Sequence, residues 1–304
     1  MPLKTRRAKD TAEVMIDYAL CNGCGLCAEV CKGQPLYVNN GQVKIDQRRL
    51  FGCIGCGHCA AICPQSCIVV QGRELSPEDL FELPGREARA DYASLLAMLQ
   101  ARRSCRAFRN REVEPEVVQR ILEAAATAPM GLPPSEVEVL VLDGFARVRE
   151  FARDAVDLMY AKRWLFSPIA LALLRPFIGK EAYALWKSFL APLPSFFHEK
   201  MEQNEDWLLY GAPLAMYFHA SPTSDPMDFA IAGTYAMLAA EASGLGTCMI
   251  GTLEPFLKHK SRLNQKYNLP ANNVHGIMVI IGYPKYTFLR GIRRSLARVD
   301  WIKR

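Results

Sequence analysis

The residues best suited to chemistry are cysteines, and most of them lie near the start of the 304-residue chain. Eight of the 11 cysteines fall between Cys21 and Cys63, in two runs that each read Cys-x2-Cys-x2-Cys-x3-Cys. Such tight runs are typical of metal ligation rather than of a secreted disulfide framework. Two Zn(Cys)4 sites would use pairs of cysteines and leave the third cysteine of each triplet unexplained. A cubane iron–sulfur cluster needs four converging thiolates, so the ligand count favours two such clusters.

The two runs repeat each other within residues 14–70, and this segment resembles a complete bacterial two-cluster ferredoxin. The resemblance implies that the fourth cysteine of each run binds the cluster of the other run. The first cysteine set is then Cys21, Cys24, Cys27 and Cys63, and the second cysteine set is Cys53, Cys56, Cys59 and Cys31. Glycine lets the backbone bend around each cluster, and four glycines stand between these cysteines: Gly23, Gly25, Gly55 and Gly57.

Three other residues in this segment are not expected to be ligands. Lys32 follows Cys31 where the ferredoxin pattern has proline, which is a departure on one side of the second set. Cys67 is predicted to be a buried thiol, and His58 to be a polar surface residue rather than a ligand.

A second polar group begins at Arg102, at the end of a helix predicted over residues 94–103. Arg102, Arg103, Ser104 and Arg106 place three guanidinium groups and a hydroxyl within five residues. Such donors suit a phosphate monoester, although a solvated basic helix end has the same composition. Three further motifs follow along the chain: Ala126-Thr-Ala-Pro129-Met-Gly131, Gly244-Leu-Gly246-Thr-Cys248-Met-Ile250-Gly251 and Arg293-Arg294-Ser295.

In order and spacing, these motifs make residues 91–303 similar to the nitroreductase family of FMN enzymes. The resemblance implies an α+β domain, FMN as the cofactor and a homodimer whose sites lie between two subunits. No side chain is expected to be catalytic, because the flavin itself carries out the chemistry.

The resemblance also assigns residues to FMN. It implies that Arg102, Ser104 and Arg106 contact the phosphate, ribityl chain or pyrimidine edge, and that Arg293 and Arg294 reach the phosphate. The backbone around three residues is expected near flavin N5 and O4, where an N–H donor favours reduction: Ile250, Gly251 and Thr252. The remaining expected cofactor contacts are Arg103, Pro129, Met130 and Gly131.

One motif departs from the family. Members commonly read Ala-Pro-Ser-x-x-Asn-x-Gln-Pro-Trp after the first long helix, and this chain has Pro133 in place of the asparagine. The amide contact is therefore lost or is supplied by Ser135 or by a backbone group, which bears on the substrate class. A dinucleotide fingerprint is also missing, since Gly244-x-Gly246 has no third glycine and follows a helix. Nitroreductases can accept NAD(P)H directly on the flavin, so this absence does not exclude a nicotinamide donor.

Composition excludes several classes of protein. With 37 Lys+Arg against 31 Asp+Glu and a mean hydropathy of +0.01, the chain reads as soluble and globular. Its net charge of +6 suits an anionic phosphate or an acidic partner better than a nucleic acid. The N-terminus has no apolar export region, and the most apolar stretch, residues 164–174, is roughly half of the ~20 residues needed to cross a bilayer. We therefore expect a cytoplasmic protein without a transmembrane segment.

The fold class expected is α+β, with a ferredoxin-like domain over residues 1–72, a linker over 73–90 and an FMN domain over 91–304. Periodicity predicts helices over 94–103, 115–127, 145–160, 228–242 and 255–267. It predicts strands over 136–142, 214–219 and 274–281, and a hairpin with its turn at residues 39–41. Residues 161–210 are rich in aromatic residues and proline and have no clear period, which leaves open a lid or a dimer surface.

Three functions are open at this stage. In the first, a one-electron donor such as an external ferredoxin feeds the clusters and FMN, which reduces a small organic acceptor: a nitroaromatic, a quinone or an activated alkene. In the second, NAD(P)H or a reduced substrate feeds FMN and the clusters deliver electrons outward. In the third, the chain is a non-catalytic redox sensor or an electron-transfer subunit.

Overall fold

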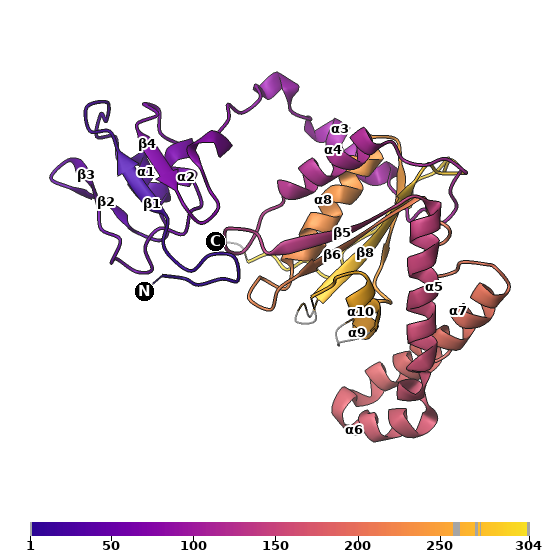
Figure 1. Cartoon of the computed structure of the whole chain (residues 1–304). Coiled ribbons are helices and arrows are strands. Elements are labelled where there is room, and N and C mark those ends of the chain that lie inside the picture. Colours follow the sequence, from indigo (N-terminus) through magenta and orange to yellow (C-terminus); the bar gives the residue numbers. More distant parts are fainter. Residues whose placement is uncertain (1, 258–261, 271–272, 274, 303–304) are drawn as a thin grey trace.

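The computed structural model describes residues 2–257, 262–270, 273 and 275–302 (Figure 1). Two units are joined by an extended segment: a cysteine-rich unit, residues 13–71, and a sheet unit, residues 92–284. The expected mixture of helices and strands is confirmed, and in the described part of the chain no helix is long and apolar enough to cross a membrane.

The cysteine-rich unit consists of two small antiparallel sheets and two short helices. β1 (Glu13–Ile16) pairs with β4 (Ile68–Gln71), and β2 (Leu36–Asn39) pairs with β3 (Gln42–Ile45). The hairpin turn falls at Asn40 and Gly41, both with positive φ, as a tight two-residue turn requires. The helices α1 (Leu26–Val30) and α2 (His58–Ala61) pack against each other between the strands.

The connection between the units is exposed over residues 78–90 and contains only two short 3₁₀ turns, Pro77–Asp79 and Arg86–Ala88. Proline and charge replace any apolar periodicity there, so no longer helix or strand forms. Arg73, the first residue of the expected linker, is buried.

The sheet unit is built on four antiparallel strands in the order β5-β6-β8-β7. The strands are β5 (Val137–Asp143), β6 (Leu214–Ala220), β7 (Gly246–Ile250) and β8 (His275–Gly282). Every residue of β6 is buried, because helices cover both faces of the sheet. α4 (Pro115–Ala126) and α8 (Asp228–Ala242) cover one face, and α5 (Phe145–Ala161) covers the other, with α7 (Leu193–Glu202) packed against α5.

α4 shows how the pattern leads to the structure. Proline at its first position fixes φ for helix entry, and Val118, Ile121 and Ala125 form one buried stripe. α8 also begins and ends as expected. The helix expected over residues 255–267 is two short helices, α9 (Glu254–Leu257) and α10 (Arg262–Lys266), and residues 258–261 lie outside the described residues. Val274, expected to begin β8, lies outside them as well.

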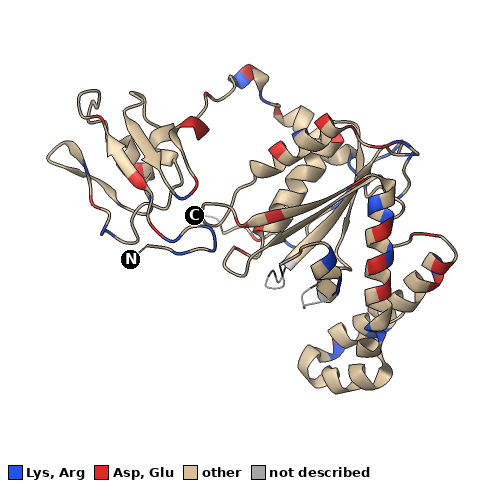
Figure 2. Ribbon diagram, viewed as in Figure 1, with Lys and Arg blue, Asp and Glu red and all other residues tan. Residues whose placement is uncertain are grey.

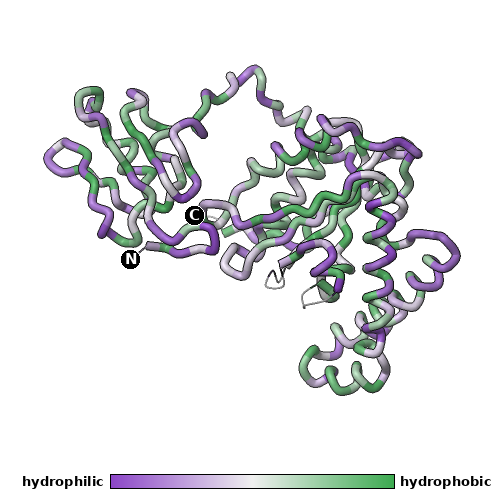
Figure 3. The backbone as a smooth tube through the Cα atoms, in the orientation of Figure 1, coloured by the Kyte–Doolittle hydropathy of each residue, from purple (hydrophilic) through white to green (hydrophobic). Residues whose placement is uncertain are grey.

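Residues 161–210 form a helical arm that projects away from the sheet (Figure 1). It holds a 3₁₀ turn (Arg163–Phe166), α6 (Pro168–Leu185), a π-helical turn (Trp186–Leu190) and α7. α6 breaks at Gly179, where φ is 79°, and its outer turns are apolar (Figure 3). By contrast α5, from which the arm departs, carries acidic and basic residues along its length (Figure 2). The arm has no single period because apolar residues lie on both its covered and its exposed sides, as with Leu171 and Phe177.

Candidate functional site

The structure gathers the eight cysteines into the two expected sets. The first set lines a small cavity: Cys21, Cys24, Cys27 and Cys63. The second set lines a separate and larger cavity: Cys31, Cys53, Cys56 and Cys59. In the described part of the chain, no three His, Cys, Asp or Glu side chains converge closely enough to hold a single metal ion. The four cysteines of each set therefore line a cavity and do not converge on the position of one metal ion.

Glycine geometry places the third cysteine of each run. Gly25, with φ 78°, precedes α1, and Gly57, with φ 72°, precedes α2. An L side chain at either position would be strained in this left-handed conformation. The sharp turn places Cys27 and Cys59 in the first turns of the two helices, where both are buried. The donor set and the shape of the backbone thus fit a metal–sulfur group.

Burial also sets the acidity of these thiols. It raises the pKa of Cys59 to about 12, and it raises the pKa of Cys27 and of Cys53. A thiolate in such a place needs a positive partner, which a metal ligated by sulfur provides.

Cys67 lies beside the first set. It is buried as expected, but it also lines the first cavity, and its Sγ is 3.4 Å from Sγ of Cys63. Sequence spacing could not show that this thiol faces the ligand set.

The residues expected to contact the phosphate, ribityl chain or pyrimidine edge of FMN follow α3 (Tyr92–Ala101); we call Arg102, Ser104 and Arg106 the anchor group. Ser104 forms a parallel bridge with Thr247 at the start of β7, and the N–H of Cys105 donates to the carbonyl oxygen of Thr247 at 2.8 Å. The guanidinium of Arg106 lies over the Tyr210 ring, 5.7 Å from its centroid. The anchor group is thus tied to the edge strand of the sheet, with Ser104 and Arg106 exposed.

Gly246 makes this approach possible. A Cβ on Gly246 would lie 2.7 Å from Cβ of Cys105, which is closer than real Cβ atoms come. At the other end of β7, Ile250 is buried, Gly251 is exposed and Thr252 is half-buried. The two expected FMN motifs therefore lie along one strand.

The C-terminal arginines lie on an exposed tail that follows the sheet unit. Arg293 and Arg294 are both exposed. A Cβ on Gly291 would lie 3.3 Å from Nη2 of Arg103, so this part of the tail passes beside the end of α3. Arg103 itself binds the carbonyl oxygens of Gln100 and Arg102. The structure thus brings the tail towards the anchor group.

Three further expected cofactor residues lie elsewhere, in the proline loop, residues 129–135, which leads into β5. Pro129, Met130 and Gly131 line the second, larger cavity together with the second cysteine set. The N–H of Gly131 donates to both carboxylate oxygens of Asp228, at 3.0 and 3.3 Å. Burial raises the pKa of Asp228, whose carboxylate holds the loop to the start of α8.

Comparison with known proteins identifies the sheet unit. The nitroreductase family model matches residues 99–283, which is more than half of the chain. The chain belongs to the nitroreductase family. A 4Fe–4S dicluster domain model matches residues 13–64, so this nitroreductase carries an N-terminal ferredoxin-type domain.

Two solved structures are similar to this chain, and the first shows its fold. A nitroreductase with bound FMN from Bacteroides fragilis is 20% identical, with 69% of this chain and 98% of that chain covered and a TM-score of 0.50. One with bound FMN from Desulfitobacterium hafniense is 22% identical, with 68% and 97% covered and a TM-score of 0.45. Comparison with curated proteins yields no match.

The two parts of this nitroreductase are held together by contacts that sequence patterns did not indicate. The Arg73 side chain is only 8% exposed and donates to four carbonyl oxygens, those of Leu3, Asp10, Ile54 and Pro133. Three of these belong to the N-terminal segment and the cysteine-rich unit, and Pro133 belongs to the proline loop. Nothing in the local sequence marks Arg73, because its partners are backbone groups distant in the chain.

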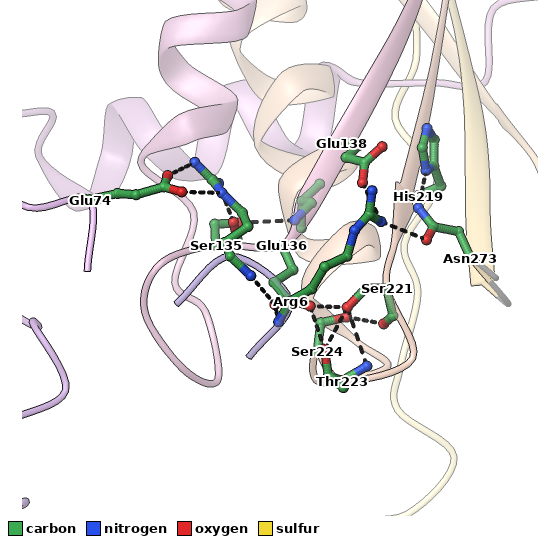
Figure 4. A network of polar contacts seen from close by, with 12 residues as sticks. Arg6, Glu74, Ser135, Glu136, Glu138, His219, Ser221, Thr223, Ser224 and Asn273 are labelled. Carbon is green, nitrogen blue, oxygen red and sulfur yellow. Dashed lines mark hydrogen bonds and ion pairs between the residues drawn. The ribbon is translucent and has the colours of Figure 1, made fainter. Parts of the chain in front are cut away.

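The N-terminal segment forms a second contact, drawn in Figure 4. The buried carboxylate of Glu136 accepts hydrogen bonds from the N–H groups of Arg6 and Arg7, and from the hydroxyls of Ser221 and Thr223. Burial raises the pKa of Glu136, but these hydrogen bonds outweigh it and the pKa is lowered. Arg7 also pairs with Glu74, so the segment bridges both units.

The cavity between the units is the main space at the candidate site, and we call it the inter-unit cavity. Its volume is about 950 Å³. The second cysteine set lines one side, and the proline loop lines the other. A cavity of this size accepts a small-molecule ligand.

Proposed function

We propose that this nitroreductase carries electrons from a one-electron donor, through two [4Fe–4S] clusters and FMN, to an organic acceptor. The observation that carries the proposal is the inter-unit cavity, which puts the cysteines of one set opposite three residues expected at the flavin. The acceptor classes that fit are nitroaromatics, quinones and activated alkenes.

Residues of this chain would hold the two clusters and FMN. The first and second cysteine sets would bind the clusters. The anchor group would contact the phosphate, ribityl chain or pyrimidine edge of FMN, and Arg293 and Arg294 would reach its phosphate. Bound FMN converts one-electron into two-electron chemistry, which is what a ferredoxin joined to a reductase requires.

The proline loop would shape the acceptor site. Met130, Pro133 and Pro134 offer apolar surface to the cavity, and the Asp228 carboxylate fixes the loop through Gly131. Pro133 stands where an amide is common in the family and cannot donate a hydrogen bond from its side chain or from its nitrogen. An apolar, planar acceptor therefore fits this wall better than one that needs an amide donor.

A homodimer is part of the proposal. No residue of α3 is buried, and Tyr92, Leu95 and Leu99 are exposed on it. The tail exposes further large apolar side chains, with Leu289 at 91% and Trp301 at 81%. Apolar surface of this extent on neighbouring segments is typical of a protein interface.

The test is anaerobic purification, measurement of iron and FMN, and flavin bleaching with reduced ferredoxin or with NADH and NADPH separately. Fast bleaching by ferredoxin alone supports the inward route. Fast bleaching by a nicotinamide instead supports outward flow through the clusters. Full cofactor loading without turnover of any acceptor would favour a sensor or an electron-transfer subunit.

A further inference from the structure

A fifth thiol lies against the first cysteine set. Cys67 is only 5% exposed and lines the first cavity together with the four cysteines of that set. Its Sγ is 3.4 Å from Sγ of Cys63, which is a hydrogen-bonding distance for two sulfur atoms. Four thiolates complete the ligands of a cubane cluster, so the ligand count leaves this thiol without a role.

The backbone on both sides of Cys67 is held in place. The chain turns after Cys63, whose carbonyl oxygen accepts a hydrogen bond from the N–H of Ser66 at 3.1 Å. The carbonyl oxygen of Cys67 accepts from the N–H of Asp17 at 2.8 Å, beside the pairing of β1 with β4. The turn and the sheet therefore hold the Cys67 thiol against the first set.

The internal repeat provides a comparison within the same chain. Cys67 follows Cys63 by four residues and immediately precedes β4. Pro35 follows Cys31 by four residues and immediately precedes β2. Pro35 lines the inter-unit cavity beside the second set, as Cys67 lines the first cavity. Proline has no side-chain donor, so the second set receives no hydrogen bond from the matching position.

The surroundings of the two sets also differ in charge. The buried Arg73 lines the inter-unit cavity, and its guanidinium acts electrostatically on Cys53 of the second set. Among the described residues that line the first cavity, none is charged, and Asn22 is the only polar residue besides the cysteines. Hydrogen bonds to the sulfurs of a cluster tune its reduction potential. In the first cavity such bonds must come from neutral donors.

We propose that the Cys67 thiol donates a hydrogen bond to the iron-bound sulfur of Cys63 and thereby raises the reduction potential of the first cluster. The proton of this pair belongs to Cys67, because a cysteine that binds iron is a thiolate and can only accept. Cys67 acts through Cys63 and is not itself a ligand. This inference rests on the proposed function, since it requires that the first set bind a cluster.

The potential of the first cluster bears on where electrons enter. Within the described residues, no part of the sheet unit lines the first cavity, whereas the second set faces the proline loop. The first cluster is then the outer of the two. A higher potential makes this outer cluster a better acceptor for an electron from an external ferredoxin.

Redox titration of the full chain, followed by the EPR signal of the reduced clusters, tests the role of Cys67. Cys67→Ala removes the donor, and Cys67→Ser keeps one. Cys248→Ala is the matched control, since Cys248 is a buried cysteine of the sheet unit outside both sets. Iron is measured on each anaerobic preparation.

Cys67→Ala is expected to keep the wild-type iron content and to make reduction of one cluster about tenfold less favourable, which lowers its potential by ~59 mV. The other cluster should keep its potential. Adding Cys56→Ser, which takes a ligand from the second set, should leave only the shifted signal. Cys67→Ser should restore most of the wild-type potential, and Cys248→Ala should change neither cluster.

Three results would overturn the inference. The first is an unchanged potential in Cys67→Ala. The second is an equal shift in Cys67→Ala and Cys67→Ser, because a hydroxyl still donates. The third is loss of roughly half of the iron in Cys67→Ala, which would make Cys67 a ligand. A wild-type protein that binds no iron would instead contradict the proposed function, before any variant is compared.

Discussion

Nη2 of Arg73 donates a hydrogen bond to the carbonyl oxygen of Pro133 at 2.7 Å, across the boundary between the cysteine-rich unit and the proline loop. The same guanidinium donates to three carbonyl oxygens on its own side of the boundary, and within the described residues no carboxylate pairs with it. Burial lowers the pKa of Arg73, as expected for a cation held by carbonyl dipoles alone. The planar fork of arginine suits this role because it can serve several acceptors at fixed angles.

Replacing Arg73 should weaken the contact between the cysteine-rich unit and the sheet unit without loss of iron or FMN. Arg73→Ala leaves buried carbonyl oxygens without donors, and we expect the contact to weaken by about 2–4 kcal/mol. Amide hydrogen exchange over residues 129–135 should rise, and proteases should cut the linker faster. Arg7→Ala is the control, because the Arg7–Glu74 pair is exposed and such pairs contribute about 0–1 kcal/mol. Equal exchange in the two variants would contradict this role for Arg73.

Replacing a residue of the anchor group should weaken FMN binding without lowering the iron content. Arg106→Ala removes a guanidinium from the anchor group, so FMN should be retained less well, by roughly tenfold or more in Kd. Iron content should stay at the wild-type value, because the cysteine sets lie in the other unit. Both are measured on the same anaerobic preparation. Simultaneous loss of iron would mean that the units do not hold their cofactors independently.

Replacing one ligand should remove one cluster. Cys56→Ser takes a thiolate from the second set, so iron should fall by about half and ferredoxin should reduce the flavin more slowly. Cys248→Ser is the control, since Cys248 is a buried cysteine of the sheet unit and lies outside both sets. If Cys56→Ser leaves the reduction rate unchanged, the second set is not on the electron route.

How much could be predicted from the sequence depends on how local each signal is. Ligand spacing and glycine positions are local, so the cysteine sets and the turns before α1 and α2 could be predicted. The separation of the anchor group from the proline loop depends on the register of β5, β6 and β8, which no local pattern contains. Arg73 could not be predicted, because it binds backbone carbonyls distant in the chain. The helical arm could not be predicted either, because its apolar residues lie on several sides and show no single period.

The contact between Gly246 and Cys105 predicts a compensating pair of substitutions. Gly246→Ala places a Cβ 2.7 Å from Cβ of Cys105 and should cost about 1–3 kcal/mol by forcing the anchor segment away from β7. FMN affinity should fall with it. Adding Cys105→Gly removes the opposing side chain and should restore much of the affinity, in a double-mutant cycle scored by FMN Kd and by unfolding free energy. Additive losses would show that the close approach does not position the anchor group.

Glu136 should make the attachment of the N-terminal segment depend on pH. Its pKa is lowered in the folded chain, so its stabilisation is present above the unfolded value of 4.5 and is lost as pH falls through the lowered folded value. Glu136→Gln, which leaves donors without a charged acceptor, should reduce stability at pH 7 by about 1–3 kcal/mol. The difference from wild type should shrink below pH 4.5. Amide hydrogen exchange of residues 5–8 measures this difference in stability. Glu138→Gln is the control, because the Glu138 side chain is half-exposed. A difference that stayed constant from pH 7 to pH 4 would mean that the Glu136 carboxylate charge does not hold the segment.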